Sequence, residues 1–258
     1  MRTAVKLLRD TWLIYQQESS LMFRSKVMIL FSLAQPISYL VLFAPFLKTT
    51  LTGQGASSYA DAYRIYVPGL LVAMGLFGGL FAGYGLLQAI RAGIIERCRV
   101  TPISRIGLLL GRALMHVTLI VMQGVIITLA AIPLGLRVNP LHLLAAYGML
   151  AMMALMATSI SYDLALMVRD QNSLGMMVQT TSQPISLLAG VLIPLSLAPL
   201  WIRDLALGNP FAWATNGIRA LFTGHGGDDV VWQGALIITA LAAISVVLSS
   251  KLFNRKIA

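Results

Sequence analysis

The segment from Tyr66 to Ile90 reads YVPGLLVAMGLFGGLFAGYGLLQAI and contains no Asp, Glu, Lys or Arg. An α-helix of about 20 apolar residues crosses a bilayer core, so this segment is long enough to span a membrane. Gly75, Gly79 and Gly83 recur at four-residue spacing, which predicts a helix face that another helix can approach closely. The helix that packs on this face belongs either to the same chain or to a second copy of the protein.

Further apolar segments flank this one on both sides. Together with 66–90, the predicted spans are 27–47, 106–134, 141–168, 174–197 and 230–248. Pro184, Pro194 and Pro199 interrupt the fifth segment, which predicts a break near its outer end. Long apolar runs favour helices over the short alternating strands of a membrane barrel. The sequence therefore predicts an all-α membrane protein with six transmembrane helices in a single domain, residues 1–258.

The composition supports a membrane location. Hydrophobic residues make up 58% of the chain and charged residues 11%, whereas soluble domains carry about 25% charged residues. The formal charge of +10 fits a partner of anionic lipid and not nucleic acid, because the apolar bulk places the chain in a membrane. Cys98 is the only cysteine, which excludes an intrachain disulfide and a cysteine-based metal cluster.

The N-terminal residues 2–23 are predicted to form an amphipathic helix. Apolar residues recur at helical spacing along one face, and Lys6, Arg9 and Asp10 lie on another. Two interpretations are a solvated leader and a helix lying in the membrane interface. Trp12 and Tyr15, which stand among basic residues, favour the interface helix.

Basic residues indicate the orientation, because Lys and Arg in short loops stay in the cytoplasm. With a cytoplasmic N-terminus, most of the 19 basic residues lie inside, and the outer side holds only Lys48, Arg64, Arg137, Arg203 and Arg219. We therefore expect a multi-pass protein of the cytoplasmic (inner) membrane with both termini in the cytoplasm.

Two long connections are candidate functional regions. The inner one, from Arg91 to Arg105, reads RAGIIERCRVTPISR, and the outer one runs from Gly190 to Asp229. The inner connection is either an ordinary basic loop with a proline turn or a docking surface for another protein. A short charged segment between two long helices can convert a partner's rigid-body movement into a tilt of those helices.

The inner connection carries a family resemblance. Thr101-Pro-Ile-Ser-Arg105, followed by Leu108-Leu-Leu-Gly111-Arg112, resembles the permease subunits of ABC-2 type exporters, and the daunorubicin-resistance-type drug exporters are the nearest group. The resemblance implies a coupling helix that docks on a separate ATPase subunit. The residues that carry over are Arg91, Glu96, Arg97, Arg99, Thr101 and Pro102.

The outer connection resembles the same family through its Pro…Pro-Leu-Trp…Asn-Pro…Arg pattern. The resemblance implies two short outer helices, one of them re-entrant, that help to close the exit; the residues concerned are Pro194, Pro199, Trp201, Arg203, Asp204, Asn209, Pro210 and Arg219. Trp201 and Trp213 equally suit an interfacial aromatic belt. Arg219 must reach water, headgroups or a carboxylate, and Asp204 is one candidate.

Asp163 is the only acidic residue inside a predicted span, where a charge at mid-membrane costs roughly 2.5–3.5 kcal/mol. It is either hydrated or paired with an arginine of the inner loop, or it lines an inward-facing cavity. Met149, Met152, Met153 and Met156 form a stripe on the same span, which we interpret as packing.

The resemblance implies an assembly of two permease copies, as a homodimer, and two ATPase subunits, with ATP and Mg bound by the ATPase and no cofactor on this chain. The expected function is export of a hydrophobic or amphipathic compound, such as a drug, an antibiotic or a lipid-like metabolite. The alternatives are an ion- or proton-coupled carrier, a membrane enzyme and a scaffold. His116, His142 and His225 are scattered, so we predict no catalytic or metal-binding residues.

Overall fold

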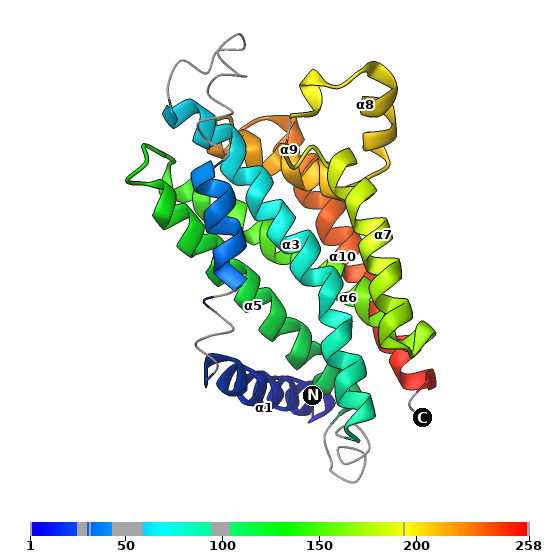
Figure 1. Cartoon of the computed structure of the whole chain (residues 1–258). Coiled ribbons are helices and arrows are strands. Elements are labelled where there is room, and N and C mark those ends of the chain that lie inside the picture. The colour runs from blue at the N-terminus through cyan, green and yellow to red at the C-terminus, as the bar shows by residue number, and fades with distance from the viewer. Residues whose placement is uncertain are drawn as a thin grey trace.

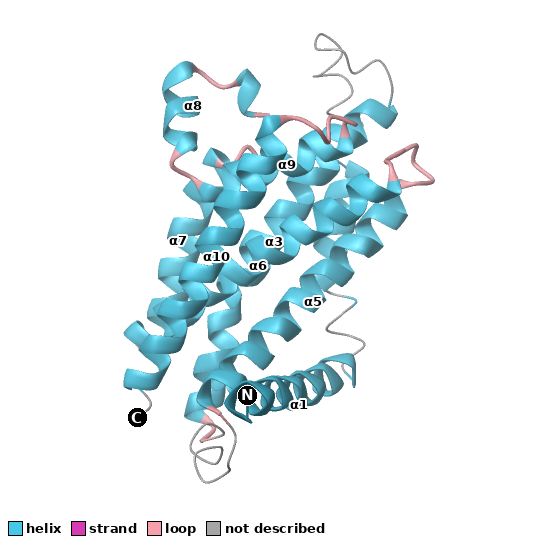
Figure 2. Cartoon of the chain, turned by 180° about the vertical axis from the view of Figure 1, so that it is seen from behind, coloured by secondary structure: helices cyan, strands magenta, loops and turns pink. Residues whose placement is uncertain are grey.

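The computed structural model describes residues 2–24, 30, 32–42, 59–93, 104–192 and 194–256, and within these ranges it contains helices and no strand (Figure 2). The elements are α1 (Arg2–Arg24), α3 (Tyr59–Arg91), α5 (Arg105–Ala131), α6 (Pro140–Val168), α7 (Gln171–Leu188), the short 3-10 helix η2 (Leu195–Leu197), α8 (Leu200–Leu207), α9 (Pro210–Phe222) and α10 (Asp229–Lys256). A further short helix covers Ser32–Leu42. The all-α prediction is confirmed.

Within the described ranges, four helices are long and apolar enough to cross a membrane: Ala60–Arg91, Ile106–Ala131, Pro140–Val168 and Asp229–Phe253. They correspond to the predicted spans 66–90, 106–134, 141–168 and 230–248. The apolar helix Ser32–Leu42 lies inside the predicted first span, 27–47, whose two ends fall outside the described residues.

The predicted fifth span, 174–197, differs from the structure at both ends. α7 begins at Gln171 because the Asp170 side chain caps it, and it ends at Leu188. Gly190 then takes a positive φ of 65°, a conformation that glycine adopts readily and that terminates helices. Pro184 lies within α7 without ending it, whereas Pro194 precedes the separate helix η2. The expected break is therefore at Gly190.

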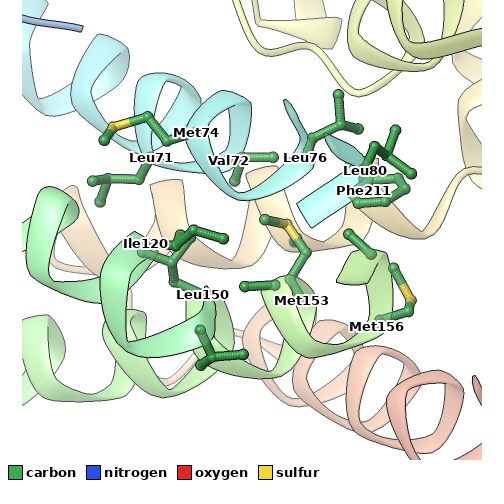
Figure 3. Packing of buried hydrophobic residues seen from close by; sticks show 14 of the residues in the cluster. Leu71, Val72, Met74, Leu76, Leu80, Ile120, Leu150, Met153, Met156 and Phe211 are labelled. Carbon is green, nitrogen blue, oxygen red and sulfur yellow. The ribbon is translucent and has the colours of Figure 1, made fainter. Parts of the chain in front are cut away.

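The core of the bundle is the contact between α3 and α6, where Leu76, Leu150 and Met153 are buried (Figure 3). The glycine face of α3 meets α6 within the same chain: a Cβ built on Gly79 would lie 2.5 Å from the Ala157 Cβ, and one on Gly83 would lie 2.6 Å from the Ser161 carbonyl oxygen. Small residues allow the two backbones to approach, which provides the close packing that holds helices together in lipid.

The two ends of the bundle carry different elements. α1 lies across one end, where both chain termini are also found, and η2, α8 and α9 lie at the other (Figure 1). We call these the α1 end and the α8 end. Leu8 and Trp12 on α1 are exposed, whereas Asp10 and Ile14 are buried beneath it. An exposed apolar face on a helix across the end of the bundle fits the predicted interface helix.

Candidate functional sites at the two ends of the bundle

At the α1 end, two glycines let α1 pack directly on α5. A Cβ on Gly111 would lie 2.7 Å from the Ile14 Cβ and 2.8 Å from the Thr11 carbonyl oxygen, so the backbones touch here. One turn earlier, a Cβ on Gly107 would lie 2.9 Å from the Asp10 Cβ. Gly107 and Gly111, the second of which belongs to the run Leu108–Arg112 that resembles the family, thus form a docking surface for α1.

Polar contacts reinforce this docking. The Asp10 carboxylate accepts a hydrogen bond of 2.7 Å from the Ser104 backbone N–H, and the Ser104 hydroxyl in turn caps α5 at Gly107. Farther along the two helices, Glu18 pairs with Arg112 at 2.8 Å, with side-chain exposures of 22% and 11%. Limited exposure to water makes such a pair more costly to break than a surface ion pair.

A second ion pair at this end joins α3 to the start of α7. The Arg91 guanidinium lies 3.2 Å from the Asp170 carboxylate and donates to the Gln171 side chain at 3.3 Å. Asp170 also accepts from the Ser173 backbone N–H at 2.8 Å. This backbone bond, then the Ser173 hydroxyl and Arg91, lower the pKa of the Asp170 carboxyl.

These contacts hold both ends of the predicted coupling loop. Arg91, where α3 ends, is bound to the α6–α7 turn, and Ser104, just before α5, is bound to α1. The remaining predicted residues, Glu96, Arg97, Arg99, Thr101 and Pro102, lie outside the described residues, as does Cys98. The contact with α1 was not predicted from the sequence, because Asp10 lies on the polar face of the predicted amphipathic helix.

At the α8 end, Asn209 joins α9 to α7. Its side-chain oxygen accepts from the Phe211 N–H at 3.1 Å and caps α9, while its amide nitrogen donates to the Ile185 carbonyl at 2.9 Å. Pro210 occupies the first turn of α9, where its missing N–H costs nothing. The Trp213 indole N–H donates to the Leu207 carbonyl at 2.9 Å, so α9 is also held to α8.

Arg219 binds backbone carbonyls and not Asp204, so the suggested pairing is wrong. Its guanidinium donates to the Ile65 carbonyl of α3 at 3.1 Å and to the Gly190 carbonyl at 3.0 Å. Asp204 is exposed on α8. Both carbonyl oxygens can accept from Arg219: Gly190 lies in a turn, and the Ile65 carbonyl of α3, like any carbonyl, has two lone pairs and can accept a second donor.

The other predicted residues at this end serve the local turns. Pro194 and Pro199 precede η2 and α8, respectively. Arg203 is exposed and donates to the carbonyls of Ala198, at 2.9 Å, and of Ser196. Trp201 is 64% exposed on α8, as an interfacial aromatic residue would be.

α7 carries an exposed polar face that the sequence analysis did not identify. Asn172, Gln179 and Gln183 lie at helical spacing on this face, with Thr180 beside them and the exposed Met176 between them; the four polar residues are all exposed. We call these four polar residues the α7 polar face. The signal in the sequence is the run of polar residues within 171–183: α7 has 18 residues but is not among the four helices that are long and apolar enough to cross a membrane.

A bundle of membrane-length helices, with an amphipathic helix across one end and two short helices at the other, defines a multi-pass integral membrane protein. Among the described residues no group of His, Cys, Asp and Glu could hold a metal ion. Residues 9–223 match the ABC-2 type transporter family, so the chain belongs to that family. A relative from Cyanophora paradoxa, "Putative transport permease ycf38", is 24% identical over 208 residues, which cover 78% of this chain and 69% of the relative. Membership supports a role in membrane transport, in a family that normally works with an ATPase subunit.

Proposed function

We propose that the chain is the membrane-spanning subunit of an ATP-driven exporter that moves a hydrophobic or amphipathic compound, such as a drug, out of the cytoplasm. Two copies form the pathway, and two ATPase subunits bind ATP and Mg and dock on the 91–105 loops. The observation that carries the proposal is the attachment of this loop at both ends: Arg91 to the start of α7 and Ser104 to α1.

This attachment supplies a mechanical route. A push on the loop reaches α7 through Arg91 and Asp170, and it reaches α1 through Ser104 and Asp10. α1 packs on α5 through backbone contacts, so these two helices move as a unit, whereas α7 follows α3 through the ion pair of Arg91 with Asp170. ATP supplies the energy on the partner, and the residues of this chain transmit the movement.

The α7 polar face supports a pathway between two copies. Polar side chains on a membrane helix are costly when they face hydrocarbon without hydrogen-bonding partners. Gln179 and Gln183 are exposed in the single chain. A second copy, or a water-filled pathway between two copies, would supply hydrogen-bonding partners for their side-chain amides. The Met149 to Met156 stripe is buried or partly buried inside the bundle and lines no such route.

Co-purification tests the docking. The triple charge reversal Glu96→Arg, Arg97→Glu and Arg99→Glu should abolish association with the ATPase, because charge complementarity at the docking surface is inverted. Arg203→Glu with Asp204→Arg is the matched control, since both residues are exposed at the α8 end. Full association of the triple variant with the ATPase would show that these three residues do not form the docking surface.

Transport in vesicles separates the exporter from a carrier that works without ATP. We expect transport only when the ATPase and ATP are both present. Transport of the same compound by the purified chain alone would favour the ion- or proton-coupled carrier. In the same preparation, Cys98 should react with membrane-impermeant thiol reagents only from the side that contains ATP.

A further inference from the structure

The inner half of the contact between α6 and α10 contains polar groups that no described residue satisfies. Asp163 and Ser159 lie one helical turn apart on α6, and Ser249 on α10 lies beside the Asp163 carboxyl. The hydroxyls of Ser159 and Ser249 and one oxygen of Asp163 are buried, and none has a partner of full hydrogen-bond geometry among the described residues, although the Ser249 hydroxyl approaches the Asp163 carboxyl. Buried polar groups without partners are rare, so each one requires an explanation.

The serine hydroxyls differ from others in the same bundle. A Ser or Thr inside a helix commonly donates to the carbonyl four residues earlier, as Thr128 does to Gly124 and Thr215 to Phe211, both at 2.9 Å. Ser250 does the same with Val246 at 2.8 Å. Its neighbour Ser249 and the α6 residue Ser159 do not donate in this way, and both are fully buried, so their oxygens can still bind another partner.

Among the residues that the structure describes, the carboxylate also has no cationic partner. The ion pairs found among the described residues are Asp61 with Arg64, Asp170 with Arg91, and Glu18 with Arg112. None includes Asp163, and Arg112, which approaches the same part of α6 from α5, is already neutralised by Glu18. A negative charge in a membrane helix requires compensation by a partner.

We propose that Ser159, Asp163 and Ser249 form a binding site for a small monovalent metal cation, with Na⁺ as the probe. Carboxylate and hydroxyl oxygens are hard ligands, which suit alkali and alkaline-earth ions and not the softer transition metals. One carboxylate balances one positive charge, which favours a monovalent ion over Ca²⁺ or Mg²⁺. The bound ion ties α10 to α6, and this role is independent of ATP and of the exported compound.

The test uses the full-length permease alone in lipid nanodiscs, without the ATPase. Raising Na⁺ from about 1 mM to about 100 mM, with choline keeping the ionic strength constant, should raise Tm by about 3 °C or more, as expected for a ligand that binds only the folded state. Radiolabelled Na⁺ should bind to the same preparation at one ion per chain.

Two variants and one control make the result specific. Asp163→Asn removes the charge with little change of shape, and Ser249→Ala removes one hydroxyl; both should abolish Na⁺ binding and the Na⁺-dependent rise in Tm. Ser250→Ala should retain both, because that hydroxyl is already bonded to Val246. Should Ser249→Ala fail to fold, Asp163→Asn decides the question.

Two results would overturn the proposal. If Tm follows pH and not Na⁺, and Asp163→Asn removes that response, the carboxyl is compensated by a proton. If Tm depends on neither and no labelled Na⁺ binds, the three oxygens are satisfied by water. Neither result affects the proposed exporter function, since no ATPase or substrate is present in the measurement.

Discussion

Different kinds of contact hold the helices together at the two ends of the bundle. At the α1 end, separate helices are joined through charged side chains: Glu18 with Arg112, Arg91 with Asp170, and Asp10 with the Ser104 N–H. At the α8 end, Asn209, Trp213 and Arg219 donate to backbone carbonyls. A half-exposed ion pair such as Arg91 with Asp170 can exchange partners at low cost, whereas the shielded pair of Glu18 with Arg112, or a buried carbonyl that loses its donor, has no ready replacement.

This difference suggests a division of roles. The contact of Arg91 with Asp170 at the α1 end can rearrange when a partner docks, because water and other charges compensate an opened, half-exposed ion pair. The α8 end resists rearrangement, because part-buried bonds connect α9 to α3 and to α7, and a more exposed bond from Trp213 connects α9 to α8. We therefore expect movement to begin at the α1 end and the α8 end to open only as a unit.

The largest expected effect is at Arg219. Arg219→Met keeps the length of the side chain but leaves the carbonyls of Ile65 and Gly190 without a donor, which should cost about 3 kcal/mol of unfolding free energy. Thermal unfolding in nanodiscs measures the loss. Arg203→Met is the matched control: that arginine also donates to carbonyls but is exposed, so its loss should cost at most about 1 kcal/mol. Equal losses in the two variants would contradict the contrast between the ends.

A smaller effect is expected where α1 docks on α5. Gly111→Ala adds a methyl group 2.7 Å from the Ile14 Cβ and 2.8 Å from a backbone oxygen of α1, so α1 must shift. Overpacking of this kind costs about 1–3 kcal/mol. Hydrogen exchange of the α1 amides should accelerate while α3 and α6 stay protected.

The control for this change is Gly148→Ala on α6, because nothing lies within 4 Å of a Cβ built there. It replaces glycine by a better helix former without a clash, so it should leave α1 exchange unchanged and slightly raise stability. Unchanged exchange of α1 in Gly111→Ala would show that α1 is not held by this contact.

The sequence predicted most of the helices but fewer of their contacts. Apolar runs such as 66–90 and 141–168 identify helices because bilayer thickness fixes their length, and Gly75, Gly79 and Gly83 indicate close packing because small side chains are needed for it. The partner of Arg219 was not predictable, since backbone carbonyls leave no trace in a sequence. Asn209 was predicted as a functional residue only because its surroundings resemble the family's sequence pattern. The end of α7 at Leu188 was not predicted, because it depends on the positive φ of Gly190.

The smallest effect on stability, and the sharpest test of the α1 end, concerns Arg91 and Asp170. Both side chains are about half exposed, so Arg91→Asp alone should leave Tm nearly unchanged while it uncouples ATP hydrolysis from transport. The double variant Arg91→Asp with Asp170→Arg should restore coupling if the pair transmits movement. If the double variant does not couple ATP hydrolysis to transport, or if the single variant couples them fully, the ion pair has no role in transmitting movement.

The same carboxylate gives this prediction a pH dependence. Because the Ser173 N–H, the Ser173 hydroxyl and Arg91 lower the pKa of Asp170 in the folded state, its stabilising contribution is fully present above the unfolded-state pKa of about 4. It is lost as the pH falls from there through the lower folded-state pKa. Coupling in the wild type should therefore weaken only in that acidic range. Asp170→Asn should abolish this response, because its amide does not titrate.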